Sequence, residues 1–175
     1  VGKDLGIFAA DAILSDMTLL GVGAGYGSSG ASTTLGGIGT GYMYPAWKGQ
    51  ITYTTPNMNG FQAKIGLTNP NQSDNAEVRT VRQDRFGIEG QVEYSFTQGK
   101  VWVSGLSYDM SGSSTGENWD AEMFDVGATV NIGNASVTGY YYSGEGFGTT
   151  VPGRYSDAAG AERDSDGGYV QATYV

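Results

Sequence analysis

Residues 86–97 read FGIEGQVEYSFT, and this stretch decides the fold. Its even positions are mostly apolar, among them Phe86, Ile88 and Val92, and its odd positions are mostly polar. Alternation with a period of two residues predicts a β-strand with one apolar and one polar face. Strands in globular proteins have about 5–6 residues, so a pattern of this length indicates a sheet that crosses a thick layer.

The same alternation recurs along the chain. In 122–132, Phe124 and Val126 lie on the face opposite Asp125, and in 100–108, Trp102 and Tyr108 share one side. Little helical periodicity separates these stretches. We therefore expect seven strands in total: 47–55, 61–67, 86–97, 100–108, 122–132, 135–143 and 168–175.

The connections between these strands alternate in length. Short turns are expected at 56–60, 98–99 and 133–134, and long polar loops near 69–84, 110–120 and 144–167. Successive connections of an up-and-down sheet lie at opposite ends, so the short turns gather at one rim and the long loops at the other. This is typical of an all-β, antiparallel, up-and-down transmembrane β-barrel. A soluble β-sandwich is the alternative fold.

Composition removes most enzyme classes. The 175 residues include 30 Gly but no His and no Cys, which excludes a Ser-His-Asp triad and any thiolate or imidazole metal site. A net charge of −9 argues against binding to nucleic acid. No apolar stretch approaches the roughly 20 residues of a membrane-spanning helix. We expect a protein that is not an enzyme and uses no cofactor or metal ion.

Residues 1–46 lack the repeated pattern of strand, turn and strand. Residues 3–8 could end a strand, and 11–16 look like a short helical turn with Asp11 as its N-cap. A glycine-rich run follows at 21–41. It contains a formal G-x-G-x-x-G match at 25–30, but neither a leading strand nor a following helix supports dinucleotide binding. A tightly folded loop is the better interpretation.

Residues 2–8 (GKDLGIF), 11–23 (DAILSDMTLLGVG) and 50–62 (QITYTTPNMNGFQ) closely resemble the general porins of Gram-negative bacteria. The resemblance implies a sixteen-stranded barrel of the outer membrane that works as a homotrimer. It also implies that 4–46 form an in-folded constriction loop and that 47–175 are membrane strands. Seven strands cannot close a bacterial barrel, so we expect 1–175 to be one incomplete porin domain, about the fifth to the twelfth strand.

Two groups of residues are candidates for the pore. The resemblance implies Asp11 and Asp16 as constriction acids, although helix capping is an equal alternative for Asp11. Because charges facing lipid are costly, the alternation assigns polar side chains to the lumen: Lys48, Gln50, Gln62, Lys64, Glu89, Gln91, Glu93 and Asp125.

We expect passive diffusion of small hydrophilic solutes and ions, with outer-membrane lipid around the barrel and a mild preference for cations. A substrate-specific channel for sugars or nucleosides, which would need an aromatic track in the lumen, and a secreted β-sandwich adhesin are the alternatives.

Three further features of the sequence concern the rims of the barrel and its long loops. Aromatic girdles of the outward face are expected to include Phe61, Phe96 and Trp102 at the short-turn rim and Phe86 and Tyr108 at the other. The stretch 162–167 (ERDSDG) echoes part of a calcium loop but lacks the closing Glu, so a solvated loop is favoured. A basic cluster, also favoured as a solvated loop, contains Arg79, Arg82 and Arg85.

Overall fold

The computed structural model describes residues 1–19, 41–69, 81–83, 85–112, 118–146 and 164–175. It contains one short helix and nine strands, which are β1 (Gly2–Leu5), α1 (Ala10–Ser15), β2 (Trp47–Thr54), β3 (Phe61–Asn69), β4 (Val81–Gln83), β5 (Gly87–Phe96), β6 (Gly99–Gly112), β7 (Asn118–Ile132), β8 (Ala135–Glu145) and β9 (Ser165–Tyr174). No helix in the described part of the chain is long and apolar enough to span a membrane.

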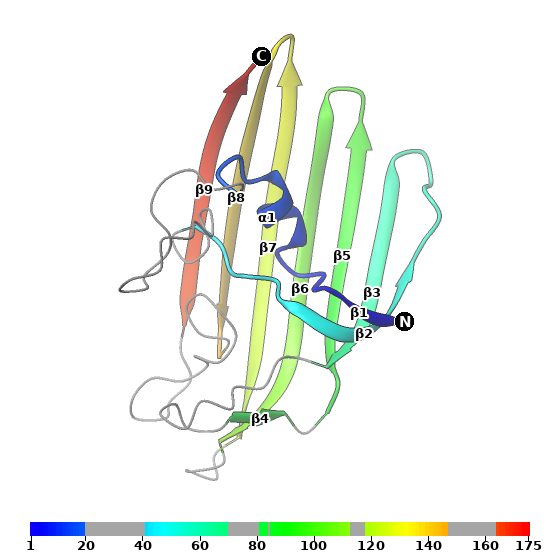
Figure 1. Cartoon of the computed structure of the whole chain (residues 1–175), viewed down its shortest axis with the longest axis vertical. Coiled ribbons are helices and arrows are strands. Elements are labelled where there is room, and N and C mark those ends of the chain that lie inside the picture. Colours follow the sequence, from blue (N-terminus) through cyan, green and yellow to red (C-terminus); the bar gives the residue numbers. More distant parts are fainter. Residues whose placement is uncertain (20–40, 70–80, 84, 113–117, 147–163) are drawn as a thin grey trace.

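The strands form one antiparallel up-and-down sheet in the order β1-β2-β3-β5-β6-β7-β8-β9, with β4 paired to β6 (Figure 1). All seven predicted strands are confirmed. β1 overlaps the strand end considered for 3–8, and β4 lies where a long loop was expected. Among the described strands β1 and β9 do not pair, so this sheet is an open one. The described strands lie in this single sheet rather than in the two packed sheets of a β-sandwich.

Several strands extend further than their side-chain pattern predicts. Residue pairs continue between β6 and β7 as far as Ser111 and Asn118, so the long loop expected at 110–120 was wrong. Likewise β8 continues to Glu145, and β9 begins at Ser165 rather than Gly168. Backbone hydrogen bonds sustain a ladder whatever the side chains are, so polar residues carry these strands beyond the apolar pattern.

The two faces of the sheet differ in character. On the outer face apolar side chains lie exposed, as at the paired Val103 and Val126, which are each 49% exposed. On the inner face the intervening side chains are mostly buried and include polar, aromatic and aliphatic groups, as at Asp125, Trp102 and Leu106. The alternation of apolar and polar faces is thus confirmed over β5 and β7.

The expected aromatic girdle needs a correction. Phe61, Tyr94 and Phe96 form a row of ring contacts near the short turns, with centroids 4.4 and 6.1 Å apart. Trp102 and Tyr108, however, are buried on the inner face, and Val101 and Val103 take the outer face of β6. The side chains of β6 are apolar on both faces near its start, so their pattern did not reveal which face is outward.

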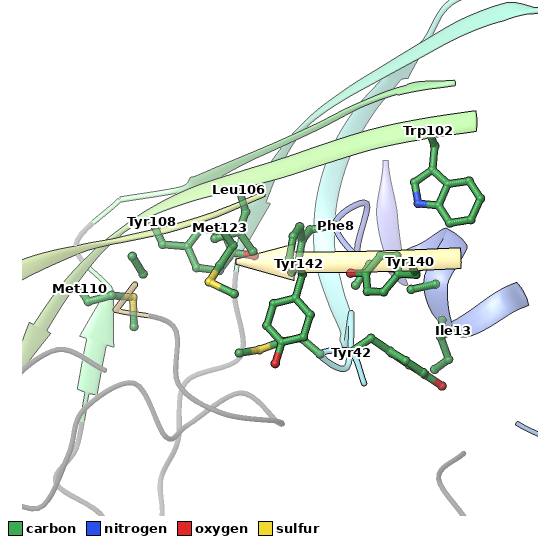
Figure 2. Packing of buried hydrophobic residues seen from close by; sticks show 14 residues of the cluster. Phe8, Ile13, Tyr42, Trp102, Leu106, Tyr108, Met110, Met123, Tyr140 and Tyr142 are labelled. Atoms are coloured by element: carbon green, nitrogen blue, oxygen red, sulfur yellow. The ribbon is translucent and has the colours of Figure 1, made fainter. Parts of the chain in front are cut away.

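The buried core lies between the inner face and a piece of the N-terminal region that we call the inner segment, residues 6–19 and 41–46 (Figure 1). Phe8, Ile13 and Tyr42 of the inner segment pack against Trp102 and Tyr140 of the sheet (Figure 2). The inner segment therefore supplies one side of this core and the sheet supplies the other.

Candidate functional site

The inner segment is hydrogen-bonded to strands between β5 and β9. Its backbone N–H groups bond to Glu89 on β5 and Asp125 on β7. Further along, the hydroxyl of Tyr169 on β9 donates to the carbonyl of Ala12 at 2.8 Å. Gln171, also on β9, donates to the carbonyl of Ser15 and accepts from the Met17 N–H. These contacts hold the segment against the inner face.

Glu89 is the first anchor, and its carboxylate accepts four hydrogen bonds. Oε2 accepts the backbone N–H groups of Ile7 at 2.6 Å and Phe8 at 3.0 Å. Oε1 accepts from the Lys48 ammonium at 2.7 Å and from the Tyr108 hydroxyl. A buried carboxylate is stable only when it is paired and hydrogen-bonded, and here the inner segment supplies half of the donors.

Asp125 is the second anchor and also has four donors. Oδ1 accepts the backbone N–H and the hydroxyl of Ser104, at 2.9 and 2.6 Å. Oδ2 accepts the Ala9 N–H at 3.1 Å and the Tyr140 hydroxyl at 3.0 Å. Ala9 has a left-handed conformation with φ of 61°. Its N–H group, like those of Ile7 and Phe8, points at a carboxylate of the sheet. Successive N–H groups of this kind form a concave anion site.

Asp11 joins a charge cluster rather than capping the helix. The N-cap of α1 is Ala9, which makes no side-chain cap bond, so the expected capping role of Asp11 was wrong. Instead its carboxylate accepts from Gln91 and from the ammonium of Lys100. Lys100 also lies 3.7 Å from Glu93. Two carboxylates and one ammonium thus form a trio whose formal charge is −1. The side chains of Lys100 and Glu93 in this trio are half-buried.

Asp16 follows α1 and organises the next turn. Its Oδ1 accepts the backbone N–H and the hydroxyl of Thr18, at 2.8 and 2.7 Å, and its Oδ2 accepts the Tyr42 hydroxyl at 2.5 Å. Asp16 therefore connects the outgoing and returning halves of the inner segment. Its half-buried carboxylate lies on the same side of the sheet as Asp11.

The remaining candidates from the sequence are spread along the inner face. Lys48, Glu89, Gln91 and Asp125 lie beneath the inner segment and are buried, whereas Gln50, Gln62, Lys64 and Glu93 are half-buried. The ammonium group of Lys64 forms no hydrogen bond or ion pair with the described residues. The formal dinucleotide motif at 25–30, Arg79 and Glu162 lie outside the described residues, as does the side chain of Arg82.

Two features that were expected in the long loops lie at least partly within the described residues. Arg85 is exposed and forms an ion pair with Asp109 at 2.5 Å. The acidic stretch that echoes a calcium loop falls partly within β9, where Asp166 pairs with Ser143 across the ladder. In the described part of the chain no group of three or more acidic side chains is placed to hold a metal ion.

A sheet with an exposed apolar outer face and a charged inner face covered by an in-folded segment is the architecture of a pore wall. The family model described as Gram-negative porin matches residues 1–175. The chain belongs to the Gram-negative porin family. It is therefore a protein of the bacterial outer membrane.

The solved structures support the porin fold. The crystal structure of the outer membrane channel DcaP of Acinetobacter baumannii matches this porin with a TM-score of 0.70 and 10% sequence identity. The match covers 99% of this chain and 47% of the other, so the chain spans about half the length of that channel. A comparison with curated proteins gave no significant match.

The sequence did not reveal an aromatic cluster on the inner face of this porin. Tyr140 stacks on Trp102, with ring centroids 6.5 Å apart, and Tyr42 meets Tyr140 edge to face (Figure 2). Tyr169 on β9 stacks on Tyr140, with ring centroids 5.5 Å apart, and meets Tyr42 edge to face. Tyr140 and Tyr142 are two residues apart, so they lie on the same face of a strand. Nothing in the sequence, however, indicated that Tyr42 would complete the cluster from a distant segment.

Proposed function

We propose that this porin contributes to a water-filled pore for the passive diffusion of small hydrophilic solutes and ions across the outer membrane. One observation carries the proposal: the sheet has an exposed apolar outer face suited to lipid and a charged inner face that anchors the inner segment. Diffusion through such a pore needs shape and electrostatics but no catalysed reaction.

We assign the narrowing of this pore to the inner segment. The segment lies across the inner face at mid-height (Figure 1). Lys48, Glu89 and Asp125 hold it against the sheet. At its margin Lys100 and Glu93 retain solvent contact, and Asp11 is buried beside Lys100. In this proposal the first set determines the position of the constriction and the second set its electric field.

A mild preference for cations follows from the second set. The trio of Asp11, Glu93 and Lys100 carries a formal charge of −1, and Asp16 adds another carboxylate to the inner segment. A negative field in a narrow part of a pore favours cations. The charge of the described Lys64, on the same face, weakens this preference without cancelling it.

The test uses the full-length protein, refolded in detergent and inserted into planar lipid bilayers. Ohmic conductance in KCl is the expected result, and proteoliposomes should swell in small neutral solutes. A reversal potential under a KCl gradient should indicate a cation preference. Clear anion preference would refute the assigned field, and the absence of any conductance would refute the pore itself. Heat-denatured protein is the control.

We also propose that the working unit is a homotrimer, which the resemblance to general porins supports. Native mass spectrometry of the detergent-solubilised protein tests this stoichiometry. A single mass near three subunits is expected, while a stable monomer that conducts would contradict the trimer and leave the pore proposal standing.

A further inference from the structure

A pocket of about 670 Å³ lies on the inner face between the inner segment and the short-turn ends of β5 to β9. Its side toward the inner segment is formed by Leu14 and Met17, and its wall includes Lys100, Thr129, Thr138 and Thr173. Ligand pockets commonly have about 300–1,000 Å³. This volume accommodates a small solute on its way through the pore.

The wall of the pocket is a field of hydroxyl and amide groups. Every inward position that β7, β8 and β9 contribute here carries a Thr, Ser, Asn or Gln side chain. The hydroxyls of Thr129 and Thr138 lie 2.9 Å apart and bond to each other. A hydroxyl group can donate one hydrogen bond and accept two, so this pair keeps the capacity to bind a further polar group.

The opposite side of the pocket is aliphatic. Leu14 is 68% exposed and Met17 is 53% exposed, although both belong to a segment that otherwise buries its apolar side chains. Gln171 accepts a hydrogen bond from the Met17 N–H, which fixes the backbone position from which the thioether side chain extends. Apolar side chains kept exposed beside a pocket favour a solute that has an apolar surface of its own.

The charge of the pocket is compensated. Lys100 is its one lining cation among the described residues, and its ammonium lies between the carboxylates of Asp11 and Glu93. An anionic solute would find no positive charge that is not already paired. The pocket thus offers hydrogen bonds on one side and aliphatic contact on the other, without an ionic attraction for anions.

We propose that this pocket is a transient binding site for uncharged, polyhydroxylated solutes of monosaccharide size. Such a solute turns its hydroxyl groups to the Thr-rich wall and the C–H face of its ring to Leu14 and Met17. The assignment rests on the proposed pore function and adds a solute class to it. Binding on the permeation path makes the flux of such solutes saturate at high concentration.

The test measures uptake of D-glucose into proteoliposomes as a function of its concentration, with KCl conductance recorded on the same preparation. Saturable uptake is expected. In the wall variant, Thr129→Val with Thr138→Val, both members of a hydrogen-bonded pair are replaced by groups of similar shape, so that neither leaves a partner unsatisfied. We expect its half-saturation concentration to rise about fivefold, the effect of one ordinary hydrogen bond.

Further variants separate the two sides of the pocket. Leu14→Gln with Met17→Gln removes the aliphatic side, and its half-saturation concentration should also rise. Thr52→Val, a substitution of the same type on β2 outside the pocket lining, should behave like the parent protein. Uptake that stays linear, or saturation that neither pocket variant changes, would refute the binding site.

Glucuronate provides the decisive comparison because it keeps the pyranose ring of glucose and carries a carboxylate at C6. Glucose should inhibit KCl conductance at lower concentration than glucuronate does. Stronger inhibition by glucuronate would overturn the assignment, since it would mean that Lys100 acts as an available cation. Absence of KCl conductance would instead contradict the pore proposal, so the two failures are distinguishable.

Discussion

The Nζ atom of Lys48 on β2 lies 2.7 Å from Oε1 of Glu89 on β5, and both side chains are almost completely buried. The other carboxylate oxygen of Glu89 holds the backbone of the inner segment. One ion pair therefore ties together two strands of the wall and the segment that covers them. Neutralising either partner disturbs the wall and the segment at once.

The first prediction concerns Glu89→Gln. This substitution leaves the Lys48 ammonium without an anion and can place an amide NH₂ against the N–H groups of Ile7 and Phe8. Removing one partner of a buried ion pair costs about 3–5 kcal/mol. We expect a lower unfolding temperature by circular dichroism and larger, noisier single-channel currents, because the inner segment is released.

The matched control for this prediction is Glu93→Gln, which changes a half-buried glutamate on the same strand. The double variant Lys48→Met with Glu89→Gln should be less destabilised than Glu89→Gln alone, because no unpaired charge remains. Equal unfolding temperatures and equal current noise in all these proteins would contradict an anchoring role for Glu89.

The second prediction concerns Asp125→Asn. An asparagine amide nitrogen cannot accept hydrogen bonds, so the Ala9 N–H or the Ser104 donors lose their acceptor. Leaving a buried donor unsatisfied costs about 1–3 kcal/mol. Hydrogen–deuterium exchange of residues 7–9 should become faster, while exchange on β3 stays as in the parent. Unchanged protection of residues 7–9 would show that Asp125 does not hold the segment.

The third prediction concerns Gly127→Ala on the inner face of β7. A Cβ atom at Gly127 would lie 2.1 Å from the indole of Trp102, which must then move. Overpacking of this kind costs about 1–3 kcal/mol. Gly139→Ala on neighbouring β8 is the control, because nothing lies within 4 Å of its Cβ position. Thermal unfolding should separate the two variants, and equal midpoints would contradict the packing argument.

The fourth prediction concerns the outer face. Val126→Lys places a charge among exposed apolar side chains, which costs about 2–4 kcal/mol at the middle of a membrane. We expect a lower yield of folded protein in lipid vesicles. Val126→Leu and Gln98→Lys, the second in an exposed turn, should fold like the parent. Efficient folding of Val126→Lys would mean that this face does not contact lipid.

The fifth prediction concerns ion selectivity. Asp11→Asn changes the formal charge of the trio of Asp11, Glu93 and Lys100 from −1 to zero. A unit charge at about 4 Å contributes roughly 1 kcal/mol in water, so the cation-to-anion permeability ratio should fall by up to about fivefold. Asp4→Asn, on exposed β1, is the control. A ratio that rises in Asp11→Asn, measured by reversal potential, would reverse the assigned field.

The sequence by itself determined the strands and the two faces of the sheet. The period of two residues in 86–97 and 122–132 could be satisfied only by strands with one apolar and one polar side, and the structure has both. It also restricted the chemistry, since a chain without His or Cys lacks the side chains that most catalytic sites use. Strand ends were less predictable, because backbone ladders extend past the side-chain pattern.

The tertiary structure alone decided what the charged residues do. In the sequence Glu89, Asp125 and Glu93 all occupy polar positions of alternating strands. In the structure Glu89 and Asp125 are buried anchors, whereas Glu93 remains in contact with solvent. The difference comes from the backbone N–H groups of residues 7–9, which lie far away in the chain and have no side-chain signature. Local patterns report the face on which a residue lies, but only packing brings in the partner that determines its role.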